Sequence, residues 1–149
     1  MFTKVAHIGF TVSNIDRSVE FYKNILGLYY QGEMIMDGPE TEELFQKVNC
    51  KARVAYLRPK EKSSPQIELI QFTDSKADKD TPDLFKTSIS ELCFMTDNID
   101  NEYNRLKSLG VEFLSSPQTF DSTEYGFGKS RAVYFYDPDG NILELIQSV

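Results

Sequence analysis

Residues 134–147 read YFYDPDGNILELIQ. The turn residues Asp137-Pro138-Asp139-Gly140 separate two runs that are rich in β-forming side chains. The stretch therefore predicts two strands, residues 131–136 and 141–146, joined by a tight turn. Its tetrapeptide ELIQ also occurs at residues 68–71, which lie 76 positions earlier. This recurrence indicates that the end of one structural unit is present twice.

The beginning of that unit is present twice as well. HIGFTVSNID starts at His7, and ELCFMTDNID starts at Glu91, 84 positions later. Between these landmarks, VAYLRP from Val54 resembles VYFYDP from Val133. A period of this length is too long for a solenoid repeat. The pattern predicts one module that was duplicated and fused.

Each copy is predicted to contain a strand, a helix and three further strands. In the first copy the helix begins near Asp16, the expected N-cap, and ends at Gly27. The strands of this copy are expected at residues 5–12, 28–35, 52–58 and 66–72, with a helical turn at 40–48. The second copy is expected to have its helix at 99–109 and its strands at 89–96, 111–114, 131–136 and 141–146.

The predicted modules span residues 1–72 and 87–149, and the polar segment 73–86 is read as a linker. Segment 115–130 contains Pro117 and two glycines, and it is expected to be a long loop. Such a loop is either a lid over a site or an ordinary surface connection. It carries the aromatic residues Phe120, Tyr125 and Phe127, which are candidates for binding the substrate.

Composition limits the classes of partner. The chain has 149 residues and a net charge of −7, from 16 basic and 23 acidic residues. An acidic chain without a basic cluster argues against nucleic acid or an anionic membrane as the main partner. The two cysteines show no metal-type or disulfide-type spacing, and we expect no signal peptide and no membrane span. We therefore expect a cytoplasmic protein with a small-molecule partner.

The opening HIGFTVSNIDRSVEFYKNILGL, the strand end IELI and the closing stretch together resemble the vicinal oxygen chelate superfamily. This group is also called the glyoxalase, bleomycin-resistance and dioxygenase superfamily, and the resemblance covers nearly the whole chain. It implies an α+β fold in which two tandem βαβββ modules, with curled mixed sheets, enclose a cavity. It also implies a divalent metal held by the first and last strands of each module, and commonly a homodimer.

Carried over position by position, the metal ligands would be His7, Glu68, Glu91 and Glu144. Many relatives have histidine where this chain has Glu91. Strand parity agrees with the assignment, because each candidate lies on the face opposite to the bulky apolar residues of its strand. Taken singly, each residue could equally be structural or solvent-exposed. As a repeat-equivalent set of one imidazole and three carboxylates, they suit Zn²⁺, Ni²⁺, Co²⁺ or Mn²⁺.

The resemblance is closest to glyoxalase I-like lactoylglutathione lyases. It implies a metal-dependent lyase or isomerase that acts on a small carbonyl or hemithioacetal substrate through an enediolate intermediate. Glu144 would be the base, and Glu68 would serve the second proton transfer. With a neutral imidazole, three carboxylates and a divalent ion, the site has a net charge of −1. This charge favours a mechanism in which one carboxylate takes up the substrate proton.

Other functions within the same fold remain open. Bleomycin-resistance relatives bind an aromatic or apolar ligand without a metal, and an aromatic content of 13% is compatible with that. Extradiol dioxygenases use two histidines and one carboxylate, which the single His7 disfavours. Arg53 and Arg131, at equivalent starts of the middle strands, are candidates for holding an anionic substrate group, although plain surface positions would explain them as well.

Overall fold

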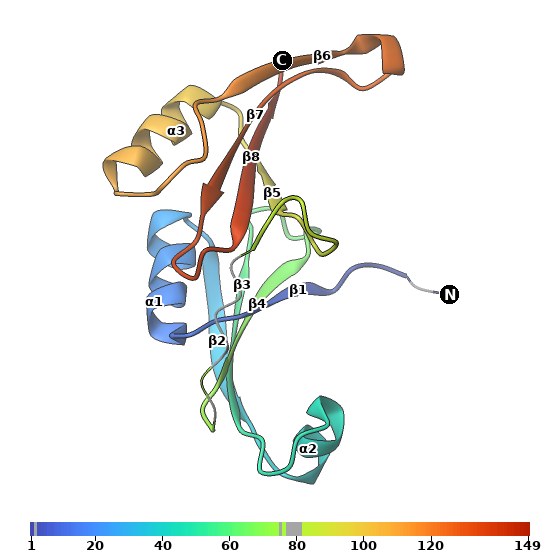
Figure 1. Cartoon of the computed structure of the whole chain (residues 1–149), viewed down its shortest axis with the longest axis vertical. Helices are drawn as coiled ribbons and strands as arrows, with labels where there is room; N and C mark the ends of the chain where they lie inside the picture. Colours follow the sequence, from blue (N-terminus) through green and yellow to red (C-terminus); the bar gives the residue numbers. More distant parts are fainter. Residues whose placement is uncertain (2, 75, 77–81) are drawn as a thin grey trace. The chain divides into compact units, whose positions relative to one another are not determined.

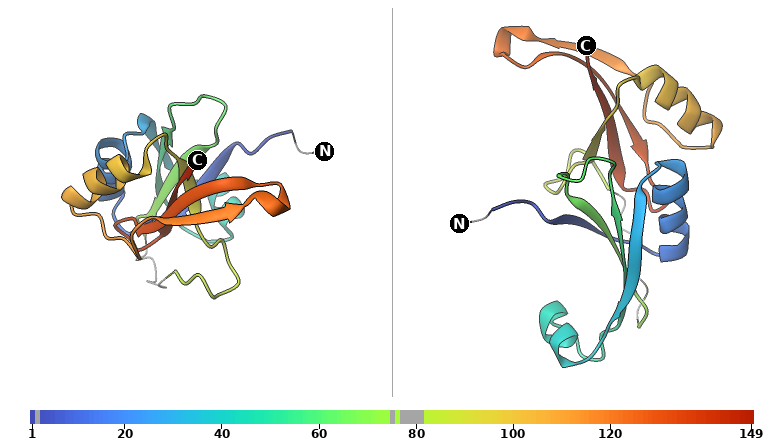
Figure 2. Two further views of the ribbon diagram at one scale, coloured as in Figure 1. Left: turned by 90° about the horizontal axis from the view of Figure 1, so that it is seen from above. Right: turned by 180° about the vertical axis from the view of Figure 1, so that it is seen from behind.

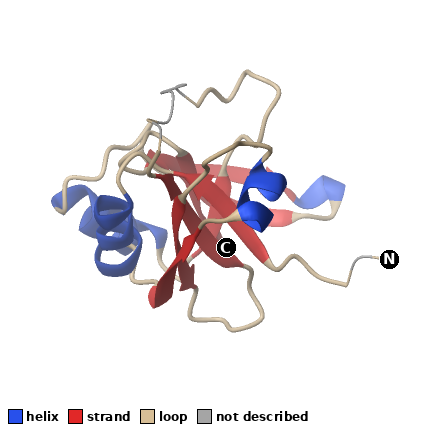
Figure 3. Cartoon of the chain, turned by 90° about the horizontal axis from the view of Figure 1, so that it is seen from below, coloured by secondary structure: helices blue, strands red, loops and turns tan. Residues whose placement is uncertain are grey.

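The computed structural model of the chain describes residues 1, 3–74, 76 and 82–149. The chain separates into two compact units, Met1–Lys79 and Asp80–Val149. Each unit has a βαβββ order of elements and one four-stranded sheet. Figure 3 colours the helices blue and the strands red. The predicted α+β class with two tandem βαβββ modules is confirmed. Within the predicted linker, residues 75 and 77–81 lie outside the described residues.

The first unit contains a mixed sheet with the strand order β1-β4-β3-β2 (Figure 1). Strand β1 runs parallel to β4, and the other neighbours are antiparallel. The α1 helix continues into a π-helical segment, Phe21–Ile25, before Gly27 turns the chain with a φ of 77°. The elements are β1 (His7–Thr11), α1 (Ile15–Glu20), β2 (Tyr29–Met36), α2 (Pro39–Phe45), β3 (Ala52–Arg58) and β4 (Gln66–Phe72).

The second unit repeats this topology with the strand order β5-β8-β7-β6. Its β6–β7 hairpin turns through a 3₁₀ segment, Thr123–Tyr125, and the hairpin tip points away from α3 (Figures 1 and 2). No helix in the described part of the chain has the length and apolar character needed to cross a membrane. The elements are β5 (Leu92–Met95), α3 (Ile99–Ser108), β6 (Gln118–Ser122), β7 (Gly128–Tyr136) and β8 (Ile142–Ser148).

One predicted strand of the second unit is wrong. Residues 111–114 form only a single bridge, between Phe113 and Phe135. The fourth strand of the sheet is instead β6, inside the segment that was expected to be a long loop. Its sequence QTFDS is mostly polar and its residues are mostly exposed. An edge strand needs only one hydrogen-bonded neighbour, here β7, so its sequence need not show the pattern of a buried strand.

Each sheet buries one face against its helix. The sheet face that contacts the helix is called the helix face below. In the first unit it packs against Ile15 of α1 and against Tyr22, which are both fully buried. In the second unit it packs on Ile99 and Leu106 of α3. Opposite these faces lie the surfaces that carry Glu68 and Glu144, named the Glu68 face and the Glu144 face below. The buried strand residues of the two helix faces are Ala55, Leu57, Ile67, Leu69, Val133, Phe135, Leu143 and Leu145.

The duplicated asparagine and glutamine residues fasten each helix to its sheet. In the first unit, Asn14 Oδ1 accepts a hydrogen bond from Arg17 N at 3.0 Å. The Gln71 side chain of β4 accepts one from Ile15 N at 2.9 Å. Asn14 is therefore the N-cap, and the expectation for Asp16 is corrected. The second unit has the same arrangement, with Asn98 bound to Asn101 N and Gln147 to Ile99 N.

Candidate functional site

His7 and Glu68 lie together on the Glu68 face of the first unit. The parallel pairing of β1 and β4 sets Gly9 opposite Glu68, and His7 lies two residues before Gly9 on the same face. His7 Nε2 is 3.5 Å from Glu68 Oε2. The histidine side chain is 45% exposed, whereas the Glu68 side chain is only 12% exposed. The pair is therefore accessible from the histidine side and partly desolvated on the carboxylate side.

Tyr56 determines which oxygen of Glu68 is available. It lies opposite Glu68 on β3, and its hydroxyl donates a hydrogen bond of 2.5 Å to Glu68 Oε1. This hydrogen bond, together with burial, raises the pKa of Tyr56 to about 12, so the hydroxyl stays protonated as a donor. The Tyr56 ring also meets the His7 ring edge-on, with the centroids 6.0 Å apart. Glu68 thus presents its second oxygen, Oε2, towards His7.

The geometry of this pair fits two ligands of one metal ion. Two donor atoms that each lie ~2.1 Å from a tetrahedral ion are separated by ~3.4 Å, which is close to the observed 3.5 Å. Gly9 leaves the necessary space, because a Cβ at this position would approach Glu68 Oε2 to 3.1 Å. His7 and Glu68 therefore satisfy the donor type and the spacing that a divalent cation requires.

In the second unit, Cys93 of β5 takes the place of Gly9 and lies opposite Glu144. Burial of the thiol, its hydrogen bond to Glu144 and the charges of Glu144 and Glu91 raise the pKa of Cys93 to about 12. Burial and the charges of the same two carboxylates also raise the pKa of Tyr134. Glu91 and Glu144 therefore both act electrostatically on Cys93 and Tyr134.

The four predicted metal ligands thus fall into two pairs, one in each unit. Within the described ranges, no three His, Cys, Asp or Glu side chains are grouped closely enough to hold a metal ion. The convergence of all four residues stays a prediction.

The structure corrects the sequence alignment of the middle strands. Tyr56 lies opposite Glu68, and Tyr134 lies opposite Glu144, so these two tyrosines are the equivalent residues. The match of Val54 with Val133 is therefore wrong by one position. A shift of one residue moves every side chain of a strand to the opposite face. In the sequence alignment Tyr56 and Tyr134 are therefore not equivalent, and neither is recognised as the neighbour of its glutamate. Counting alternate residues along the middle strands from the positions that pair with the two glutamates would have identified both tyrosines.

Arg53 and Arg131 are not on the faces that carry the glutamates. Arg53 lies on the helix face and pairs with Asp16 at 2.7 Å and with Glu33 at 2.6 Å. Arg131 makes the equivalent pair with Asp100. These ion pairs raise the pKa of each arginine and lower those of Asp16 and Asp100. Each arginine joins the first turn of a helix to the sheet, so their assignment to the substrate is not retained.

Of the three aromatic residues expected in the lid, one lies on the Glu144 face. Phe120 of β6 pairs with Ser130, which in turn pairs with Ser148, four residues beyond Glu144. Tyr125 and Phe127 lie at the tip of the β6–β7 hairpin and are 72% and 85% exposed. The segment is thus an ordered hairpin, and only Phe120 shares the face of the candidate base.

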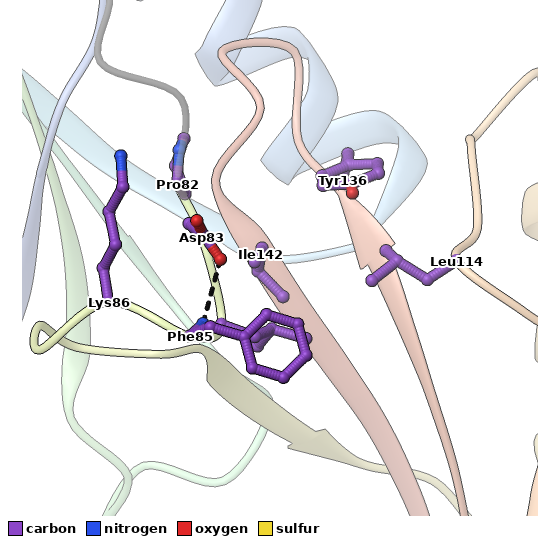
Figure 4. A pocket seen from close by; sticks show the side chains of 8 residues that line it. Pro82, Asp83, Phe85, Lys86, Leu114, Tyr136 and Ile142 are labelled. Atoms are coloured by element: carbon purple, nitrogen blue, oxygen red, sulfur yellow. Dashed lines mark hydrogen bonds between the residues drawn. The ribbon is translucent and has the colours of Figure 1, made fainter.

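A pocket of about 290 Å³ lies in the second unit. Its floor includes Tyr136 and Ile142, a cross-strand pair that lies two residues along each strand from Tyr134 and Glu144. Phe85 and Leu114 contribute further apolar surface (Figure 4). The turn that carries Phe85 is held by a hydrogen bond from its backbone N to Asp83, at 2.9 Å. Residues 82–86 were predicted to belong to the linker, and no sequence pattern indicated this pocket.

Comparisons with known proteins agree with this fold. The family model of the glyoxalase/bleomycin resistance protein/dioxygenase superfamily matches residues 4–145. A 2-epi-5-epi-valiolone epimerase from Actinomyces is 28% identical over 147 residues, covering 95% of this chain and 78% of that protein. A glyoxalase-family protein from Bacillus cereus has a similar structure, with a TM-score of 0.84, 18% identity, and coverage of 100% of this chain and 96% of the other.

An antibiotic-binding protein from Streptomyces, TnmS3, shares the fold with a TM-score of 0.67 and 19% identity, covering 99% of this chain and 98% of that protein. The chain is thus similar in sequence to a named epimerase and in fold to a named antibiotic-binding protein. The family model spans nearly the whole sequence, including the positions of His7, Glu68 and Glu144. This chain belongs to the glyoxalase/bleomycin resistance protein/dioxygenase superfamily.

Proposed function

We propose that the protein is a metal-dependent lyase or isomerase that moves a proton between neighbouring carbons of a small carbonyl or hemithioacetal substrate. The observation that carries this proposal is the His7–Glu68 pair, with its 3.5 Å spacing and the space that Gly9 leaves beside it. The spacing suits a shared cation better than a direct hydrogen bond, which would be ~0.5 Å shorter.

His7, Glu68, Glu91 and Glu144 would hold one divalent ion (Zn²⁺, Ni²⁺, Co²⁺ or Mn²⁺), supplied either by one chain or by two copies in a homodimer. When bound, the ion polarises a substrate oxygen and stabilises negative charge that develops there. Tyr56 keeps Glu68 oriented by holding its Oε1, so Glu68 acts mainly as a fixed ligand.

Glu144 is the proposed base. In the part of the chain that the structure describes, the Tyr134 hydroxyl gives Glu144 no hydrogen bond equivalent to the one from Tyr56 to Glu68. Glu144 instead accepts a hydrogen bond from the Cys93 thiol, which is a weaker donor than a phenol, and so remains able to accept the proton from the substrate carbon. That proton returns at the neighbouring carbon while another moves between the two oxygens. The reaction is an internal redox isomerisation and needs no external oxidant.

The similarity to an epimerase supports a reaction of this kind. An epimerase inverts a carbon centre, which removal and return of a proton can achieve. Proton abstraction by a carboxylate base next to a polarised oxygen is the step that the two activities would share. The proposal for this chain is accordingly proton transfer, with the hemithioacetal as the first substrate to test.

The test combines metal analysis with kinetics. The purified protein should contain about one divalent ion per site and should isomerise the adduct of methylglyoxal with one of a panel of small thiols. Glu144→Gln should lower kcat by about 10²–10⁴-fold while the metal stays bound, because general base catalysis contributes that much. Near wild-type kcat in a metal-loaded Glu144→Gln protein would refute the assignment of the base.

A second candidate function is metal-free binding of an apolar ligand, which the pocket around Tyr136 and Ile142 favours. Its volume of about 290 Å³ is close to the lower end of the range for small-molecule sites. Elemental analysis separates the two functions, because a sequestering protein should bind its ligand equally well after chelation of all metal. Sedimentation of the purified protein tests the homodimer independently.

A further inference from the structure

We propose that Arg58 binds a carboxylate group of the substrate, so that the substrate class is a short carbonyl compound with an acidic end. This inference rests on the proposed function for the identity of the reacting centre, but the anion site itself is defined within the first unit. Arg58 is absent from the candidates that sequence analysis produced.

Arg58 lies on the same face as Glu68. It is the last residue of β3 and lies two residues beyond Tyr56, so both side chains project from one side of the sheet. Two strand residues span about 7 Å. A carboxylate held by Arg58 would therefore lie a few carbon atoms away from a group that contacts Glu68.

Two contacts hold the guanidinium in place. It stacks over the Tyr29 ring of β2 at 4.7 Å from the ring centroid. Its Nη1 donates to the backbone oxygens of Pro59 and Lys60, at 3.0 and 3.4 Å. Because neither contact uses Nε or Nη2, the edge that forms paired hydrogen bonds with a carboxylate remains available. The group is thus positioned before a ligand binds, which lowers the entropic cost of binding.

Arg58 differs from Arg53, Arg105 and Arg131 in its lack of an acidic partner. Arg53 pairs with Asp16 and Glu33, Arg131 with Asp100, and Arg105 with Glu102. Among the described residues, no carboxylate lies within ion-pair distance of Arg58. A half-buried cation without a counter-ion, on the face of the candidate site, is a ready receptor for an anion in an otherwise acidic protein.

The second unit lacks this feature. The position equivalent to Arg58 is Tyr136, two residues beyond Tyr134, where the apolar pocket is found. The repeat therefore preserves the strands but replaces a cation with an aromatic ring. Anion recognition consequently belongs to the Glu68 face alone.

The test uses two matched probes, levulinate and its uncharged analogue levulinamide, which share a ketone and differ in the carboxylate. Binding is measured by NMR titration of the metal-free and the metal-loaded protein, including the Arg58 Nε–H signal. Wild type should bind levulinate about tenfold more tightly than levulinamide, as expected for a charge-assisted hydrogen bond. Arg58→Met should abolish this preference, whereas Lys60→Met, which removes a neighbouring charge, should preserve it.

The proposal is overturned if wild type shows no preference, if Arg58→Met keeps it, or if Lys60→Met removes it equally. The shift of the Arg58 Nε–H signal in wild type tests the contact without any variant, and an unmoved signal at saturation also overturns it. A retained preference without turnover of any hemithioacetal would refute the proposed reaction and leave the anion site supported. Turnover without a preference would refute only the anion site.

Discussion

Replacing Tyr56 with phenylalanine removes one hydroxyl and leaves the aromatic ring in place. The hydroxyl donates the 2.5 Å hydrogen bond to Glu68 Oε1, and the Glu68 side chain is only 12% exposed. Water therefore replaces the lost donor only in part. We expect Tyr56→Phe to leave Glu68 less well oriented and partly unsatisfied.

This hydrogen bond determines the expected loss of stability and the expected loss of metal affinity. A hydrogen bond to a charged group contributes about 1.5–3 kcal/mol, so the unfolding free energy of the metal-free protein should fall by that amount. For a chain of this length the corresponding decrease in Tm is roughly 3–10 °C. Loss of a partner that orients a metal ligand typically weakens metal affinity by about 10–100-fold, which is the loss expected for Zn²⁺ or Co²⁺.

Tyr134→Phe is the matched control, because Tyr134 lies opposite Glu144 but is not joined to it by an equivalent hydrogen bond in the described structure. Isothermal titration measures metal affinity, and thermal unfolding after chelation measures stability. Equal metal affinity in Tyr56→Phe and wild type would refute the orienting role. The same losses in Tyr134→Phe would show that removal of a hydroxyl, and not loss of the hydrogen bond to Glu68, is responsible.

Three further predictions test other parts of the structure. Glu91→Gln should weaken metal affinity with little effect on kcat at saturating metal, since this residue is assigned only as a ligand; metal titration and kinetics check this. Gly9→Ala should lower metal affinity while circular dichroism stays unchanged, because the new Cβ would lie 3.1 Å from Glu68 Oε2. Arg53 lowers the pKa of Asp16, so their pair stabilises the fold above pH ~4 and loses this effect as the pH falls. Arg53→Gln should therefore be less stable than wild type at pH 7, and this difference should shrink towards pH 3 in denaturant titrations.

Most of the fold could be predicted because the internal repeat and the alternation of apolar and polar residues indicate the same strands. Residues 52–58 and 66–72 were predicted as strands at the bounds that the structure has. The duplicated Asn-Ile-Asp sequence and the final glutamine of ELIQ recur because each copy uses them to join its helix to its sheet. Parity also placed His7 and Glu68 on one face, and their side chains are adjacent.

The errors arose where tertiary contacts override local sequence. Strand β6 has a polar sequence because its only ladder partner is β7. Arg53 and Arg131 were selected because they are repeat-equivalent, but this equivalence reflects a shared structural ion pair with Asp16 and Asp100. Arg58 was overlooked because the alignment of VAYLRP with VYFYDP pairs it with Asp137, whereas the sheet registers pair it with Tyr136.

The two units differ most informatively at the positions that surround the two glutamates. On the helix faces, equivalent positions carry the same kinds of residue, because both units must bury an apolar core and hold one helix. On the opposite faces, Gly9 corresponds to Cys93, and Arg58 corresponds to Tyr136. Packing alone does not demand these differences, since the strand order is the same in both sheets. We infer that Glu68 is held as a ligand next to an anion site, whereas Glu144, which accepts a hydrogen bond from the Cys93 thiol, remains able to accept a proton.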